Sequence, residues 1–121
     1  MVKFEKVHKK FPDGTEALDD VSFHIKPGEF VSIVGQSGTG KTTMVKLINA
    51  EDHVTSGQIT VGGWNITKIR RSEIPHLRRQ IGVVYQDFRL LPKKTVFENV
   101  SFALEVCGER RKKIEYIVEQ V

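Results

Sequence analysis

Cysteine is almost absent from this sequence of 121 residues, in which Cys107 is the only one. A single thiol cannot close an internal disulfide, and no cluster of cysteine and histidine residues has the spacing of a zinc site. The sequence therefore excludes the small disulfide-rich secreted proteins and the zinc-finger proteins.

Long apolar runs are missing as well. No stretch approaches the ~18 consecutive apolar residues from which a membrane-spanning helix is expected. Residues 1–7 alternate apolar and charged side chains, where a secretory signal would need an unbroken apolar run. These absences predict a cytoplasmic protein that reaches a membrane only through a partner.

The composition fits one globular domain, with 39% hydrophobic and 28% charged residues. The formal net charge is +4, and residues 68–94 alone carry eight basic and two acidic side chains, a net +6. Such a cluster is typical either of a solvated surface or of contacts with phosphate or nucleic acid. Charge alone leaves both interpretations open.

Strands are predicted in five segments. Alternation of apolar and polar residues predicts strands at residues 2–7, 21–25 and 57–61. Turn-forming residues at positions 11–14 separate the first two of them. Two short apolar runs, residues 30–34 and 81–85, are predicted to be buried central strands, the first of them parallel to its neighbours.

Four helices are predicted from apolar spacing and capping signals, beginning near Lys41, Ser72, Thr95 and Glu109. Ser72 is the expected N-cap of a short helix that has Pro75 in its first turn. Thr95 and Glu98 have the spacing of a capping box, so a helix is expected to begin there and to stop at residues 107–108.

The motif that carries chemistry is residues 35–42, GQSGTGKT, which match the phosphate-binding loop G-x-x-x-x-G-K-[ST] between a predicted strand and a predicted helix. Its glycines let backbone N–H groups approach phosphate oxygens at the positive end of the helix dipole. Lys41 would contact the β- and γ-phosphates, and Thr42 would offer its hydroxyl to Mg²⁺. The residues expected to bind the nucleotide are Gly35, Gln36, Ser37, Gly38, Thr39, Gly40, Lys41, Thr42 and Thr43.

Gln86 is a second candidate, 45 residues beyond Lys41 and at the end of the apolar run 81–85. A glutamine at a strand end can reach a metal or an attacking water through its amide. An ordinary polar surface residue is the alternative. Asp87 as the metal carboxylate at the end of such a run is disfavoured, because Gln86 interrupts the run directly before it.

Longer stretches of the sequence resemble the ATP-binding-cassette (ABC) ATPases, and they cover nearly the whole chain: residues 17–23, 27–30, 35–42, 77–91 and 95–100. Residues 74–79 and 87–92 resemble the cell-division branch of that family. The resemblance implies an α/β fold, in which a P-loop NTPase core carries an antiparallel β subdomain. Residues 1–121 would be the N-terminal part of one nucleotide-binding domain, ending before the signature sequence and the second metal-binding strand.

The resemblance also implies roles for single residues. Phe11 occupies the place of an aromatic residue that stacks on adenine, although a hairpin or core aromatic would explain it too. Lys41 and Gln86 are the implied catalytic residues, and Thr42 and Gln86 the implied Mg²⁺ ligands. Ala50 departs from the family pattern, in which Gly is common after the first helix.

The implied ligands are ATP and Mg²⁺, and the implied partners are an FtsX-like membrane permease and a second copy of the chain, with two ATP molecules between the copies. Residues 87–95 would dock the permease at the cytoplasmic face of the membrane, which explains the basic segment without nucleic acid. The resemblance places the family's general base C-terminal to the region present here, so ATP binding with negligible turnover is expected of these 121 residues.

Three alternatives remain open at this point. The chain could belong to a related ABC exporter of the lipoprotein or macrolide type. It could be a small nucleotide kinase or a GTPase, although residues 65–68 do not form the guanine-specific Asn-Lys-x-Asp motif. It could also be a non-enzymatic module that binds nucleic acid through residues 68–94, in which case binding would depend steeply on salt.

Overall fold

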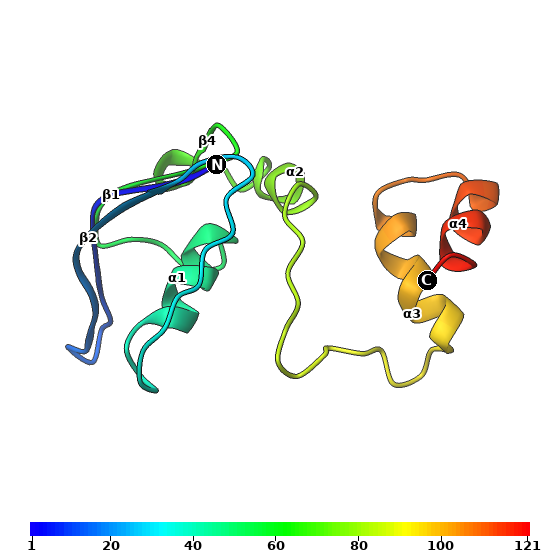
Figure 1. Ribbon diagram of the computed structural model, residues 1–121, viewed down its shortest axis with the longest axis horizontal. Helices are drawn as coiled ribbons and strands as arrows, with labels where there is room; N and C mark the ends of the chain where they lie inside the picture. Colours follow the sequence, from blue (N-terminus) through cyan, green and yellow to red (C-terminus); the bar gives the residue numbers. More distant parts are fainter. The chain divides into compact units, whose positions relative to one another are not determined.

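The computed structural model describes all 121 residues. The chain divides into two compact units, Met1–Gly82 and Val83–Val121 (Figure 1). Each unit is described below by itself.

The first unit is built on one antiparallel sheet with the strand order β2-β1-β3-β4. The strands are β1 (Val2–Lys10), β2 (Glu16–Ile25), β3 (Ser56–Val61) and the short β4 (Trp64–Asn65). The strands predicted at residues 2–7, 21–25 and 57–61 are thus confirmed, and each extends beyond the predicted bounds. Strands β1 and β2 form a hairpin, whose turn is closed by the Phe11 N–H bonded to the Thr15 carbonyl at 2.8 Å.

Helix α1 (Lys41–Ile48), the 3-10 helix η1 (Ile66–Lys68) and helix α2 (Ile74–Arg78) complete this unit. A single buried cluster holds them to the sheet, with Leu47 from α1, Ile66 from η1 and Leu77 from α2. From the sheet come Phe4, Val7, Leu18, Ile59 and Val61. The helix predicted from Lys41 is therefore confirmed, and burial of its apolar face is what fixes it against the sheet.

The end of α1 explains the family departure at position 50. Ala50 has a φ of 50°, in the left-handed region that glycine adopts without strain. The Arg78 guanidinium donates hydrogen bonds to the carbonyls of Asn49 and Ala50, both at 3.0 Å. These bonds satisfy two carbonyl groups at the helix end, so the chain keeps this conformation with an alanine.

The two predicted central strands are wrong. Residues 30–34 and 81–85 form no strand and pair with no strand of the sheet. Phe30 is 97% exposed and Val84 is 96% exposed. An apolar run becomes a buried strand only when neighbouring strands accept its backbone hydrogen bonds and cover its faces, and this chain supplies no such neighbour.

Residues 30–34 nevertheless have two different sides. Val31 and Ile33 line an apolar hollow of about 310 Å³ together with Val21, Phe23 and Met44. Phe30 and Val34, at 97% and 88% exposure, face solvent. The segment therefore lies along the apolar side chains of β2 and α1 on one side and has no cover on the other.

The predicted cap of α2 is also wrong by one residue. Glu73, and not Ser72, is the N-cap, and Pro75 lies in the first turn as predicted. A preceding turn explains the shift, because the Glu73 N–H donates to the Arg70 carbonyl at 2.9 Å. The Glu73 carboxylate in turn accepts the Arg70 N–H at 2.8 Å.

The second unit contains α3 (Val96–Val106) and α4 (Arg111–Val118). The capping box at Thr95 and Glu98 is confirmed, and α3 ends with Cys107 as its C-cap, as the sequence predicted. Helix α4 begins slightly later than predicted, with Arg110 as N-cap. No helix of the chain has the length and apolar character that crossing a membrane requires.

Candidate nucleotide-binding site

The candidate site lies in the first unit, where residues 35–40 lead into α1. Gly38 and Gly40 have φ values of 83° and 84°, which only glycine adopts without strain. The Thr39 hydroxyl donates to the Gln36 carbonyl at 2.8 Å and holds the loop in a compact turn. The loop is exposed up to Thr39, and only Gly40 is buried.

Helix α1 begins without a side-chain cap, because its N-cap is Gly40. The first helical bond at this end runs from the Met44 N–H to the Gly40 carbonyl at 2.9 Å. The N–H groups of Lys41, Thr42 and Thr43 precede it and have no acceptor within the helix. They form the positive end of the helix dipole, which favours an anion such as phosphate.

Gly40 also ties this loop to the sheet. A Cβ at position 40 would lie 2.3 Å from the Ala17 carbonyl oxygen and 3.0 Å from the Leu18 Cδ2 atom. The loop therefore approaches the start of β2, only a few residues from the hairpin turn that carries Phe11. Only glycine permits this approach, since the neighbour at 2.3 Å is backbone that cannot move aside.

The ammonium group of Lys41 lies over the loop. Its Nζ donates to the Gly35 carbonyl at 2.8 Å and to the Gln36 carbonyl, and lies 3.3 Å from the Thr39 hydroxyl. Gly35 leaves room for this arrangement, because a Cβ there would lie 2.8 Å from the Thr39 hydroxyl. The positive charge is thus held at the loop beside the uncapped helix end, where both attract the same anion.

Thr42 is exposed in the first turn of α1, one residue beyond Lys41. Its hydroxyl is a hard oxygen donor of the kind that Mg²⁺ accepts alongside phosphate oxygens and water. The residues present therefore fit a magnesium nucleotide. That residues 35–43 contact it stays a prediction.

Phe11 lies in the hairpin turn and outside the buried cluster of the first unit. Its ring is half-buried, and the Lys9 Nζ lies 4.9 Å from the ring centroid. A core aromatic and a hairpin aromatic were the alternatives to an adenine contact. The structure shows that Phe11 is not a core residue. The adenine contact itself stays a prediction.

Gln86 belongs to the second unit and is exposed. The strand that was expected to end at Gln86 does not form. The structure therefore brings together the phosphate loop and the Phe11 hairpin within the first unit. The roles of Gln86 as a metal ligand and catalytic residue stay predictions.

Sequence reasoning missed Lys9, a buried lysine next to this site. Its exposure is only 8%, and its Nζ donates to the Asp52 carboxylate at 2.6 Å and to the His53 carbonyl at 2.8 Å. The alternation of side chains along a strand could have identified it. Lys9 lies two residues after the buried Val7, so the two side chains lie on the same face of β1. A lysine at such a position needs a buried acceptor.

The fold and the loop together define an ATP-binding cassette. The chain belongs to the ABC transporter family, whose sequence profile matches residues 18–121. This confirms the resemblance to ABC ATPases and the predicted fold class.

Individual relatives narrow the comparison. The cell division ATP-binding protein FtsE of Bacillus subtilis (strain 168) is 50% identical over 121 residues, which are 100% of this chain and 53% of that protein. The protein of the same name from Escherichia coli (strain K12) is 43% identical over 108 residues, 89% of this chain and 49% of the relative. The chain thus spans about half the length of these curated relatives.

A solved structure has the same fold. The ATP-binding cassette MJ0796, in a dimeric post-hydrolysis state bound to ADP and Pi, superposes with a TM-score of 0.89 at 34% sequence identity. The match covers 99% of this chain and 55% of the other. The structure therefore corresponds to the N-terminal part of such a cassette.

Proposed function

We propose that residues 35–43 of this chain bind the phosphates of Mg-ATP. The observation that carries the proposal is the uncapped start of α1 at Gly40, with the Lys41 ammonium held over the adjoining loop. The helix start provides backbone N–H groups without an acceptor, and Lys41 provides a positive charge beside them. ATP binding is further supported by the names of the relatives and by the ADP and Pi bound to the similar cassette.

The residues of the loop would have distinct tasks. The N–H groups at the start of α1 would bind phosphate oxygens, and the Lys41 ammonium would exchange its loop carbonyls for the β- and γ-phosphates. Thr42 would hold Mg²⁺, which supplies charge neutralisation between the phosphates. Phe11 would stack on the base, and Gln86 would complete the metal site.

For the whole protein, we propose an ATPase of the cell-division type that hydrolyses ATP as a homodimer. It would act with an FtsX-like membrane permease at the cytoplasmic face of the membrane. The names of the relatives and the dimeric state of the similar cassette support this. Exposed apolar side chains within residues 87–95 support the docking of a partner there, since Phe88 is 78% and Leu90 is 69% exposed.

Calorimetric titration with Mg-ATP tests the site. We expect Lys41→Met to lower the affinity about tenfold to a hundredfold, because a charge-assisted hydrogen bond contributes ~1.5–3 kcal/mol. Lys46→Met is the matched control, since Lys46 is an exposed lysine in the last turn of the same helix. It should bind like the wild type, and circular dichroism should show equal helix content in all three proteins.

The proposed contact between Thr42 and Mg²⁺ is tested by comparing ATP affinity with and without magnesium. Thr42→Val should lower the affinity for ATP when magnesium is present and leave it unchanged in excess chelator. Equal affinity of wild type and Lys41→Met for Mg-ATP would contradict the proposed function.

A further inference from the structure

We propose that Lys9 is a positioning residue for the base of the nucleotide, and that its buried ammonium fixes the ring of Phe11 for stacking. The inference rests on the proposed function, because it assigns a residue to the base subsite of the same ATP site. Lys9 itself touches neither base nor phosphate in this proposal. It acts through Phe11.

The ammonium of Lys9 is held in one place by its acceptors. The Asp52 carboxylate and the His53 carbonyl accept from Nζ at 2.6 and 2.8 Å, and the residue is 8% exposed. Burial alone would raise the pKa of Asp52, but the hydrogen bonds from Lys9 and from the His53 N–H outweigh it and hold this pKa below its usual 3.8. The Asp52 carboxylate is therefore charged at neutral pH, and its hydrogen bond fixes the position of the Lys9 Nζ.

The ring of Phe11 is the third neighbour of this nitrogen, with its centroid 4.9 Å from Nζ. A cation at this distance from an aromatic face is attracted by the ring quadrupole, so it favours one orientation of the ring. The phenyl ring has two faces, and a cation on one of them leaves the other for a flat partner. A ring that is already oriented loses less freedom when a nucleobase stacks on it.

Lys9 also fixes where the ring stands relative to the phosphate loop. Asp52 and His53 follow α1, so their bonds to Lys9 join the hairpin to the chain beyond the end of that helix. At the other end of α1, Gly40 lies against Ala17 on the second strand of the same hairpin. The hairpin is thus tied at both ends of the helix that begins at the phosphate loop, which sets the spacing between a base subsite and a phosphate subsite.

Two ligands separate positioning of the base from binding of phosphate. Mg-ATP carries a base, and magnesium tripolyphosphate carries only the phosphates. In calorimetric titrations of the whole chain, we expect Lys9→Met to weaken Mg-ATP about threefold to tenfold, as loss of a cation–aromatic contact implies. Tripolyphosphate should bind unchanged.

The control is Lys10→Met, which removes the neighbouring exposed lysine of β1 and should change neither affinity. Lys9→Arg keeps the charge and should restore most of the Mg-ATP affinity. If Lys9→Met does not fold, Asp52→Asn serves in its place, because it keeps the shape of the carboxylate and removes the charge that holds the ammonium. It should give the same selective loss.

A second measurement does not depend on nucleotide. The aromatic ¹H resonances of Phe11 should move in Lys9→Met and stay in place in Lys10→Met. Equal weakening of both ligands would show a merely structural role and overturn the inference, and so would unchanged Mg-ATP affinity. Wild-type protein that binds neither ligand would overturn the proposed function as well, whereas equal binding of both by the wild type would overturn only the base subsite.

Discussion

Gly40 serves two purposes within one residue. Its left-handed φ of 84° starts α1 without a side-chain cap, and its missing Cβ lets the loop lie against the Ala17 carbonyl. The first leaves helix N–H groups free for an anion, and the second fixes the loop to the sheet.

Replacing Gly40 with alanine should therefore cost more than backbone strain alone. The left-handed conformation costs an alanine ~1–2 kcal/mol, and displacing the Ala17 backbone raises the expected loss of unfolding free energy to about 3 kcal/mol. Urea unfolding followed by the fluorescence of Trp64, the only tryptophan and a residue of the same unit, measures it.

Gly38→Ala is the matched control for this change. Gly38 has nearly the same φ, 83°, but nothing lies within 4 Å of the added Cβ. The Gly38→Ala variant should lose only ~1 kcal/mol of unfolding free energy. Equal losses in the two variants would contradict the close approach of the loop to β2.

The motif G-x-x-x-x-G-K-[ST] requires Gly40 and leaves position 38 open. It gives no reason why a Cβ would be tolerated at position 38 and not at position 40. The difference arises from a contact with Ala17, 23 residues earlier in the chain, which no local pattern contains. Lys9 is a similar case, because its acceptors Asp52 and His53 lie far along the sequence.

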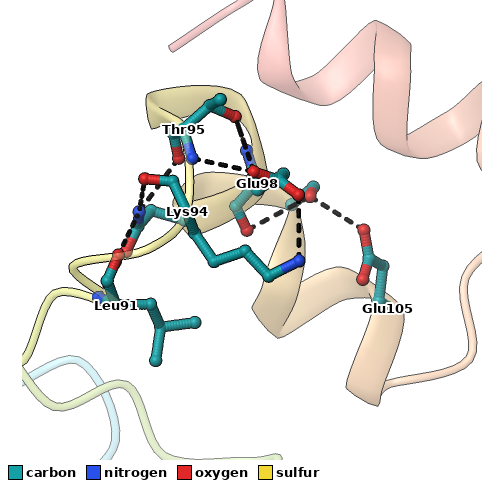
Figure 2. A network of polar contacts seen from close by, with 7 residues as sticks. Leu91, Lys94, Thr95, Glu98 and Glu105 are labelled. Carbon is teal, nitrogen blue, oxygen red and sulfur yellow. Dashed lines mark hydrogen bonds and ion pairs between the residues drawn. The ribbon is translucent and has the colours of Figure 1, made fainter.

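At the scale of elements, α3 begins with the most complete set of local signals in the chain. The Thr95 hydroxyl accepts the Glu98 N–H at 3.2 Å, and the Glu98 carboxylate accepts the Thr95 N–H at 2.8 Å (Figure 2). Lys94 adds an ion pair to the same carboxylate at 2.9 Å. Glu98 also lies in the first turn, where the helix dipole favours negative charge.

These contacts make the second unit sensitive to acid. The Thr95 N–H, the Lys94 ammonium and the Thr95 hydroxyl lower the pKa of Glu98 from 4.5 to about 2. The folded pKa is below the unfolded one, so the stabilising contribution is complete above pH 4.5 and is lost as the pH falls from there toward 2. An NMR titration of the Glu98 side-chain carboxyl should give a midpoint near 2.

Thr95→Ala provides the comparison for this titration. It removes the hydroxyl of the cap and leaves the backbone N–H of position 95 and the Lys94 ammonium in place, so the Glu98 midpoint should rise toward 4.5 without reaching it. A wild-type midpoint at 4.5 would be incompatible with the capping box as an interaction present in solution.

The helices and the turn that the sequence predicted correctly share a local cause. Capping boxes, turn residues and helical spacing act within a few residues of one another, so the chain carries them wherever it folds. Residues 30–34 have the composition of a buried strand, yet a strand requires a partner that sequence composition cannot supply. The partner is not among β1–β4.

At the scale of the whole molecule, unpaired apolar segments have a consequence for behaviour in solution. Phe30 and Val34 are large side chains at 97% and 88% exposure on one short segment. Exposed apolar groups that lie close together promote association between molecules.

We expect the 121-residue chain to self-associate as its concentration rises, and the double substitution Phe30→Ser with Val34→Ser to reduce this association. Light scattering and sedimentation over a concentration series measure it. Val121→Ser is the control, since Val121 is 90% exposed but lies at the end of the chain, away from that segment. A wild-type chain that stays monomeric throughout the series would contradict the expectation.

The sequence by itself determined the hairpin turn, the starts of α1 and α3 and the family, because each is encoded in spacings of a few residues or in long matching stretches. The tertiary structure decided which segments pair as strands and which distant residues come into contact. It left residues 30–34 and 81–85 without strand partners, and it brought Lys9 to Asp52 and Gly40 to Ala17. Pairing of strands and burial of a charge depend on residues distant in the chain, so only the folded chain can settle them.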